Sequence, residues 1–153
     1  MIAVLQRVNS ATVIADGEPA GKIGKGLYIL LGVMQGDGET EAGLLAEKIC
    51  KLRIFCDDED KMNLSVRDVG GEILVVSNFT LGANYSHGNR PDYFGAASPD
   101  IAERLYLYFL ELIREKMGKV EAGVFGADMQ SELSTDGPVT IVMNSDLLKK
   151  GRG

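Results

Sequence analysis

The sequence predicts a single mixed α/β domain in which two strand-to-helix units lie within a larger set of strands. The chain has 153 residues, which is the length of one ordinary domain. Its composition, with 45% hydrophobic and 25% charged residues, is typical of a globular protein with its own core. Its apolar runs have the length of strands, and two segments carry apolar residues at helical spacing. We therefore expect one domain over residues 1–153, with a disordered tail from about residue 146.

The first part of the chain predicts strands separated by turns. Residues 2–8 and 11–15 are rich in β-prone apolar side chains. Asp16-Gly17 is a strong hairpin signal, and residues 18–23 would form the returning arm. The continuous apolar run over residues 27–33 indicates a strand that is buried on both faces.

The first helix is predicted over residues 40–52. Its apolar stripe consists of Leu45, Ile49 and Leu52, at helical spacing. Glu41 and Glu47 fall outside this stripe, so we expect them on the surface. Gly70-Gly71 then opens another apolar strand, over residues 72–79.

A second helix is predicted to begin after Ser98 and to end at Gly118. Ser98 is a residue that caps helices, Pro99 suits the first helical position, and glycine commonly ends helices. The apolar stripe of this helix is predicted to consist of Ile101, Leu105, Tyr108, Phe109 and Leu112.

The last part of the chain is predicted to hold three strands, near residues 120–124, 129–134 and 139–143. Asp136-Gly137-Pro138 would form the sharp turn between the last two strands. On base rates alone, the peptide before Pro138 would be an ordinary trans bond.

Charge and composition exclude several classes of function. The chain carries 16 Lys and Arg residues against 22 Asp and Glu residues, and its net charge of −6 is unlike that of a general DNA or RNA binder. The single histidine, His87, leaves no Ser-His-Asp triad and no histidine-rich metal site, and no nucleotide-binding motif is present. We therefore expect no metal and no cofactor. The apolar runs are too short for a membrane helix, no signal peptide is visible, and only two cysteines occur, so we expect a cytoplasmic protein without a membrane partner.

The candidate chemistry is therefore limited to hydroxyl and backbone groups. Ser77-Asn78-Phe79-Thr80 follows an apolar strand, and the carboxyl end of a strand is a favoured place for function in an α/β fold. Ser77 and Thr80 offer hydroxyls, and the N–H groups beside them could bind an oxyanion. In Phe125-Gly126-Ala127-Asp128-Met129, the small residues suggest a close backbone approach. Taken singly, each signal also fits a plain turn.

Taken together and in order, nine blocks of this sequence resemble the D-aminoacyl-tRNA deacylase family. The blocks are residues 5–8, 31–33, 51–55, 61–65, 68–71, 77–81, 90–91, 125–129 and 136–140. The resemblance implies a compact fold of β/β/α layers with the order β2-(βα)2-β3, and a homodimer with active sites at the subunit interface. It also implies hydrolysis of the ester bond of D-aminoacyl-tRNA, which is a proofreading step of translation.

The resemblance assigns catalytic roles to Ser77, Phe79 and Thr80. These residues would form the floor beside the scissile ester and the 3′-terminal adenosine, and the backbone at Phe79 and Thr80 would polarise the carbonyl. The tRNA 2′-hydroxyl would assist the attack of water, and the alternative is that Thr80 is a covalent nucleophile. No general base beside Thr80 is visible in the sequence, which favours the route through water.

The resemblance also implies how chirality is read. Gly137-Pro138 would be a cis dipeptide that reaches into the partner subunit's site, where its carbonyl oxygens hold the α-amino group and an L side chain would clash. Glycine has no side chain to clash, so glycyl-tRNA would be hydrolysed as well. Asn78 and Met129 would also contact the substrate. Asn78 stands where the family usually has glutamine, so the role of its side chain is open.

Only the terminal nucleotide of the RNA would be read, which reconciles RNA binding with the acidic composition and implies no DNA partner. Arg7 and Arg90 are candidates for nearby phosphate contacts. Two alternatives remain open at this point. One is a non-catalytic module that binds tRNA ends or a protein, and the other is a hydrolase of small esters that uses Ser77 or Thr80 as nucleophile.

Overall fold

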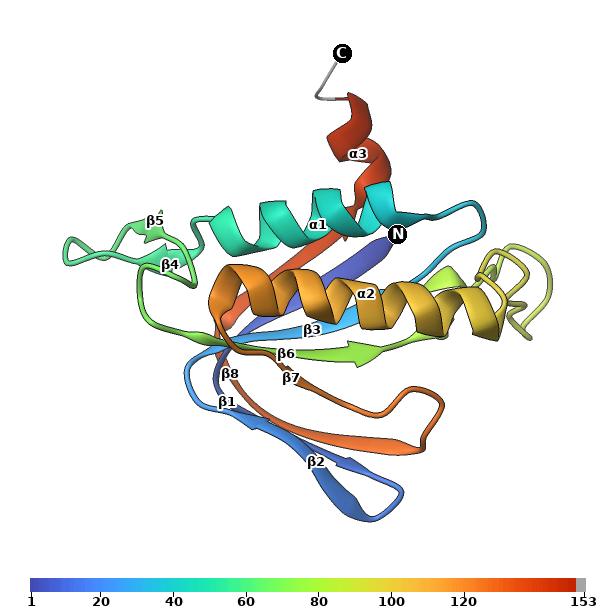
Figure 1. Ribbon diagram of the computed structural model, residues 1–153, viewed down its shortest axis with the longest axis horizontal. Coiled ribbons are helices and arrows are strands. Elements are labelled where there is room, and N and C mark those ends of the chain that lie inside the picture. The colour runs from blue at the N-terminus through green and yellow to red at the C-terminus, as the bar shows by residue number, and fades with distance from the viewer. Residues whose placement is uncertain (151–153) are drawn as a thin grey trace.

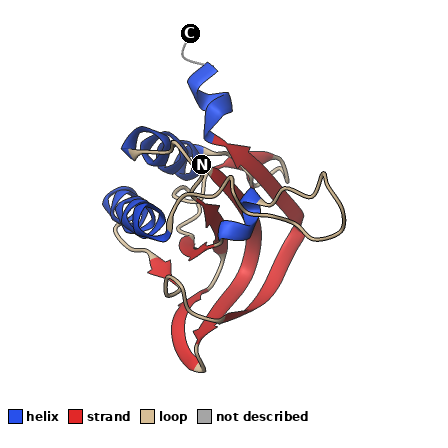
Figure 2. Cartoon of the chain, turned by 90° about the vertical axis from the view of Figure 1, so that its right-hand side faces the viewer, coloured by secondary structure: helices blue, strands red, loops and turns tan. Residues whose placement is uncertain are grey.

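A six-stranded mixed sheet forms the centre of the fold, and two long helices cover one of its faces (Figure 1). The computed structural model describes residues 1–150. Figure 2 shows the two long helices side by side against the strongly curved sheet. In chain order, the elements are β1 (Ile2–Ala15), β2 (Glu18–Ile23), β3 (Gly26–Gly32), α1 (Glu39–Lys51), β4 (Phe55–Cys56), β5 (Met62–Leu64), β6 (Glu72–Ser77), the 3₁₀ helix η1 (Phe79–Gly82), α2 (Pro99–Met117), β7 (Glu121–Ala122), β8 (Met129–Asn144) and α3 (Ser145–Lys150).

The sheet has the strand order β2-β1-β3-β6-β7, and β8 pairs with β1 along the other side of that strand. The pairs β3–β6 and β6–β7 are parallel, whereas β1 pairs antiparallel with β2, β3 and β8. Strands β4 and β5 form a separate two-stranded sheet. This architecture confirms the mixed α/β class that the sequence predicts.

Two pairs of predicted strands are each a single strand in the structure. Residues 2–8 and 11–15 both belong to β1, and residues 129–134 and 139–143 both belong to β8. The register explains this, because β8 pairs with β1 from Ala15 opposite Met129 to Ile2 opposite Asn144. The expected sharp turn at residues 136–138 is therefore wrong: the chain bulges there and continues in the same direction.

The sheet curls until β2 contacts β7, and Gly21 permits the close approach. A Cβ atom at Gly21 would lie 2.9 Å from the carbonyl oxygen of Ala122, so a side chain has no room there. The curl encloses one apolar cluster, and α1 and α2 cover a second one on the opposite face. The enclosed cluster consists of Val8, Ala11, Val13, Ile23, Tyr28, Leu74 and Val76. The two layers of the curled sheet and the helix layer form the predicted β/β/α arrangement.

Helix α2 has the predicted ends but a different buried stripe. Pro99 occupies its first turn and Gly118 ends it with a φ of +81°, although the Ser98 side chain makes no capping hydrogen bond. Ile101 is exposed and Tyr106 is buried, with its hydroxyl donating to the carbonyl oxygen of Val75 at 2.9 Å. The buried residues of this helix are Ala102, Leu105, Tyr106, Phe109, Leu110 and Ile113. The polar tip of Tyr106 therefore anchors α2 to β6.

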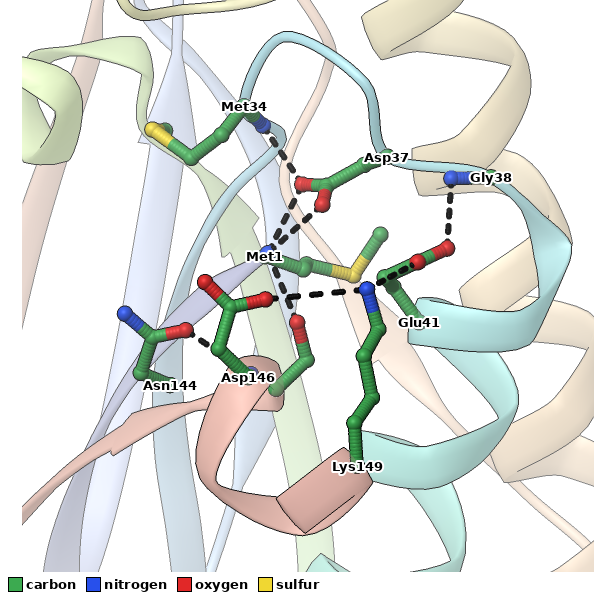
Figure 3. A network of polar contacts seen from close by, with 9 residues as sticks. Met1, Met34, Asp37, Gly38, Glu41, Asn144, Asp146 and Lys149 are labelled. Carbon is green, nitrogen blue, oxygen red and sulfur yellow. Dashed lines mark hydrogen bonds and ion pairs between the residues drawn. The ribbon is translucent and has the colours of Figure 1, made fainter.

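Helix α3 occupies residues that the sequence predicts to be disordered (Figure 3). The Ser145 hydroxyl accepts a hydrogen bond from the Met1 ammonium at 2.9 Å, and the backbone N–H of Ser145 donates to the Met1 carbonyl oxygen at 2.9 Å. The Met1 ammonium also lies 2.8 Å from the Asp37 carboxylate. These contacts attach the start of α3 to the first strand. The rest of the predicted tail, residues 151–153, lies outside the described residues.

Glu41 is buried, contrary to the surface position predicted for it. Its carboxylate accepts a hydrogen bond from the Gly38 backbone N–H at 2.8 Å and pairs with the Lys149 ammonium at 2.5 Å (Figure 3). The pKa of Glu41 is lowered to about 2, mainly by the hydrogen bond from Lys149. Burial opposes this shift, and the hydrogen bond from Gly38 lowers the pKa further. This ion pair therefore joins α3 to the first turn of α1. Among the described residues, no helix is long and apolar enough to cross a membrane.

Candidate functional site

A cavity of about 690 Å³ lies where β6 ends, and four of the predicted site residues line it. Ser77 pairs with Leu31 of β3 in parallel register, and the N–H of Asn78 donates to the Leu31 carbonyl oxygen at 2.8 Å. The chain then leaves the sheet through η1, which brings Phe79 to the cavity. This is the strand-end position that the sequence predicts for the site.

The side chain of Asn78 is directed at its own loop. Its Oδ1 atom accepts hydrogen bonds from the backbone N–H of Thr80 at 3.2 Å and from the Thr80 hydroxyl at 2.5 Å. Asn78 is thereby the N-cap of η1. The Thr80 N–H is engaged, whereas the N–H of Phe79, at the first position of η1, has no acceptor within the helix. Phe79 therefore offers the free backbone donor at this end of the strand.

Thr80 is exposed and does not line the cavity. Its hydroxyl proton is directed at the Asn78 amide oxygen, which is not a base that accepts a proton. Among residues 1–150, no group of three or more His, Cys, Asp or Glu residues could hold a metal ion.

Another part of the cavity lining comes from the segment that begins at Phe125 and includes Gly126 and Met129. Gly126 has a φ of +78°, which favours glycine, but no atom lies within 4 Å of an added Cβ there, so the close backbone approach expected at this residue is wrong. The backbone N–H of Asp16 donates to the Asp128 carbonyl oxygen at 2.8 Å, and the backbone N–H of Asp128 donates to the Asp16 carboxylate at 3.1 Å. These hydrogen bonds fix this segment to the first hairpin. Met129 lines the cavity from the start of β8.

Two hydroxyls that the sequence did not single out also line the cavity. Tyr28 and Ser131 share a hydrogen bond of 2.6 Å, and burial raises the pKa of the Tyr28 hydroxyl, which is therefore neutral at physiological pH. Tyr93 also lines the cavity, and its ring packs edge-on against the ring of Phe79 at 5.1 Å between centroids. A tyrosine within the otherwise apolar run of residues 27–33 was the one available signal, whereas nothing in the sequence marks Ser131 or Tyr93.

Gly137 and Pro138 lie elsewhere, in the bulge of β8. The peptide between them is cis, and Gly137 has a φ of +128°. Val8 of β1 pairs with Thr135 of β8, and Gln6 pairs with Thr140. Two steps along β1 therefore correspond to five steps along β8. The additional residues of β8 form the bulge, and Gly137 and Pro138 are both exposed on it.

Arg7 supports this bulge, so the expected phosphate contact of Arg7 is wrong. The side chain is buried, and its Nη1 atom donates to the Ile54 carbonyl oxygen at 2.8 Å. Its Nε atom donates to the carbonyl oxygen of Asp136 at 3.3 Å and lies 3.1 Å from the Asp136 carboxylate. The guanidinium therefore has its partners within the protein. Arg90 is exposed, as a phosphate contact would require.

Within one chain the bulge is remote from the cavity. On β3, Leu27 pairs with Arg7 and Leu31 pairs with Ser77, so four residues separate the two places. This corresponds to about 13 Å along the strand, in addition to the separation across the sheet. The structure thus brings Ser77, Asn78, Phe79 and Met129 together, and leaves Gly137 and Pro138 outside.

Comparison with known proteins identifies related sequences and structures. The family model described as D-Tyr-tRNA(Tyr) deacylase matches residues 4–144. A D-aminoacyl-tRNA deacylase from Pelobacter propionicus is 52% identical over 143 residues, covering 94% of this chain and 99% of that protein. One from Caldicellulosiruptor bescii is 50% identical over 145 residues, covering 95% and 97%. Among solved structures, the c-Myc DNA Unwinding Element Binding Protein has a TM-score of 0.88 at 41% identity, covering 94% of this chain and 98% of that one.

Proposed function

The chain belongs to the D-Tyr-tRNA(Tyr) deacylase family and hydrolyses the ester bond of D-aminoacyl-tRNA, and we propose that it does so in the cavity beside Ser77 and Phe79. One observation carries this placement: of residues 77–80, predicted as the floor of the site, residues 77–79 line a cavity of about 690 Å³. That volume lies within the range of small-ligand sites. The aminoacyl group and the 3′-terminal adenosine would occupy it, and free D-amino acid and tRNA would leave.

The proposed reaction is attack by water, assisted by the substrate's own 2′-hydroxyl. The water oxygen forms a bond to the ester carbonyl carbon, the bond from that carbon to the ribose oxygen breaks, and the ribose oxygen gains the proton. The N–H of Phe79, which has no acceptor within η1, would stabilise the oxyanion. Ser77 and Thr80 would orient groups. The hydrogen bond from Thr80 to Asn78 argues against Thr80 as nucleophile, because an amide oxygen is not a base that activates it.

We propose that Gly137 and Pro138 read chirality in the site of a second subunit. Both residues are exposed on β8, which pairs with no strand other than β1 in the described chain. Val142 on the same strand is 70% exposed, so this edge offers main-chain and apolar groups to a second copy. The main-chain oxygens of the bulge would bind the α-amino group, and an L side chain would then meet the backbone. Glycine would pass, so glycyl-tRNA is a further proposed substrate.

The place of action that we propose is the cytoplasm, where aminoacyl-tRNA is used. The activity is tested by incubating the protein with D-Tyr-tRNA, L-Tyr-tRNA and Gly-tRNA and following the release of amino acid. We expect release from the first and third, and little from the second. Equal rates on the D and L substrates would contradict chiral reading. Tight binding of D-Tyr-tRNA without release would instead support a non-catalytic module. A homodimer is tested by measuring the mass in solution.

A further inference from the structure

The exposed aromatic side chains of this protein are gathered in one segment. Of the aromatic residues in the described chain, only Phe79, Tyr85, Tyr93 and Phe94 are exposed, and they all lie within residues 79–94. Tyr85 and Phe94 are 82% and 81% exposed. Large aromatic side chains on a surface commonly mark a binding surface when they occur together. We call these four residues the aromatic rim.

The aromatic rim begins at the cavity and continues away from it. Phe79 and Tyr93 line the cavity and pack edge-on at 5.1 Å between ring centroids. Asn84 and Asp92 exchange two backbone hydrogen bonds, of 2.8 Å and 3.0 Å, which places Tyr85 next to the segment that carries Tyr93. Phe94 follows Tyr93 directly. The rim therefore extends from the start of η1 onto the loop between η1 and α2, at the N-terminal end of α2 (Figure 1).

The charges of the segment oppose the approach of a polyanion less than the chain as a whole does. The chain has 22 Asp and Glu residues, but residues 73–99 contain only one of them, Asp92, and also contain Arg90. The repulsion expected from a net charge of −6 is therefore reduced on this segment. The aromatic rim and the low density of acidic residues occur in the same place.

We propose that the aromatic rim stacks the unpaired bases that precede the terminal adenosine at the 3′ end of the tRNA. This inference rests on the proposed placement of that adenosine in the cavity, because the rim is continuous with the cavity wall. Every base has a π face, so stacking holds a single strand without reading its sequence and without many phosphate contacts. An acidic enzyme thereby binds an RNA end that all its substrates share.

The test compares a long and a short substrate. Tyr85→Ala and Phe94→Ala are assayed on D-Tyr-tRNA and on D-tyrosyl-adenosine, which lacks the preceding bases. We expect each variant to raise KM for D-Tyr-tRNA roughly fivefold to 100-fold, with kcat unchanged. Kinetics on D-tyrosyl-adenosine should stay within twofold of wild type. Tyr85→Phe should retain the wild-type KM, because the ring remains. Leu107→Ala and Met62→Ala, at exposed apolar residues elsewhere, serve as controls.

Three outcomes would overturn the inference. An equal change in KM on both substrates would mean that the residues shape the cavity, and no change on either would mean that the bases do not stack. A change in the mass of the protein in solution would assign the rim to a subunit interface. A binding measurement separates this inference from the proposed reaction. It uses a single-stranded RNA that ends in CCA and carries no amino acid, and it follows binding by fluorescence anisotropy. Weaker binding by Tyr85→Ala would support the aromatic rim even if the ester were not cleaved in the cavity.

Discussion

The Nε atom of Arg7 lies 3.1 Å from the Asp136 carboxylate and donates to the backbone carbonyl oxygen of the same residue at 3.3 Å. Arg7 thus holds both the side chain and the main chain of the residue that precedes Gly137. Its other end donates to the Ile54 carbonyl oxygen, so the bulge of β8 is connected to the segment after α1. If the bulge of β8 distinguishes D from L substrates, the buried Arg7 side chain of β1 sets the position of the main-chain oxygens that do so.

Arg7→Lys should therefore lower both stability and selectivity. Lysine keeps the charge, but it is a single ammonium and cannot reach Ile54 and both groups of Asp136 together. We expect a loss of about 2–4 kcal/mol in the free energy of unfolding, because buried acceptors lose their donor. The ratio of rates on D-Tyr-tRNA and L-Tyr-tRNA should fall. Urea unfolding and the two rates measure these effects, and Arg104→Lys at an exposed ion pair is the matched control. If folded Arg7→Lys protein keeps the wild-type ratio of rates on D-Tyr-tRNA and L-Tyr-tRNA, Arg7 has no role in chiral selectivity.

Local patterns in the sequence predict the elements, whereas contacts between distant segments decide how these combine. The start and end of α2 follow from Pro99 and Gly118, which act within one turn of the chain. The single strand β8 follows from pairing with β1, more than 100 residues away in the sequence, so its two halves were predicted as separate strands. The buried stripe of α2 likewise depends on which tyrosine reaches Val75.

The same division applies to the site. Ser77, Asn78 and Phe79 are consecutive, so one segment at a strand end was enough to predict them. Tyr28 and Ser131 lie 103 positions apart and meet only because the sheet curls. The bulge at Gly137 was predicted as a turn because glycine and proline favour both, and only a long partner strand distinguishes the two.

Gly137→Ala should disturb the bulge more than backbone strain alone would. Its φ of +128° disfavours any side chain, and a Cβ atom would lie 2.8 Å from the Val139 nitrogen. Gly17→Ala is the matched control, because Gly17 also has a positive φ, of +82°, but no atom lies within 4 Å of the added Cβ. We expect Gly17→Ala to cost about 1 kcal/mol and Gly137→Ala about 2–4 kcal/mol. Thermal unfolding measures both. Only Gly137→Ala should lower the D/L ratio of rates, and an equal effect of the two changes would remove the steric explanation.

The Glu41–Lys149 ion pair should make stability depend on acid pH. The folded-state pKa of Glu41, about 2, is below its ordinary value of 4.5, so the pair stabilises the fold fully above pH 4.5 and loses this effect as the pH falls towards 2. At pH 7, Glu41→Gln should cost up to about 2 kcal/mol, because Lys149 is partly open to solvent and screening reduces the effect. The difference between wild type and variant should shrink from pH 5 to pH 2 in urea unfolding. Glu47→Gln, at an exposed carboxylate of the same helix, should change stability by less than about 0.5 kcal/mol at every pH. A difference that stays constant with pH would mean that the Glu41 carboxylate is not the titrating group.

Substitutions at Thr80 and Asn78 distinguish an orienting hydroxyl from a nucleophile. Because the Thr80 hydroxyl donates to the Asn78 amide oxygen, Thr80→Val removes one hydrogen bond while keeping the shape of the side chain. An orienting role predicts a decrease in the single-turnover rate of about tenfold, which is the worth of one such bond. A nucleophilic role predicts that the rate falls to background and that wild type accumulates an aminoacyl-enzyme ester, detectable by mass spectrometry. Asn78→Ala removes this bond and also the hydrogen bond from the Thr80 N–H, so it should lower the rate at least as much as Thr80→Val. The double variant should add little to Asn78→Ala, because the hydroxyl bond is already lost. Asn78→Asp keeps an acceptor in place and should retain most of the rate. A much larger loss in Thr80→Val than in Asn78→Ala, together with a trapped ester on Thr80, would establish the covalent route instead.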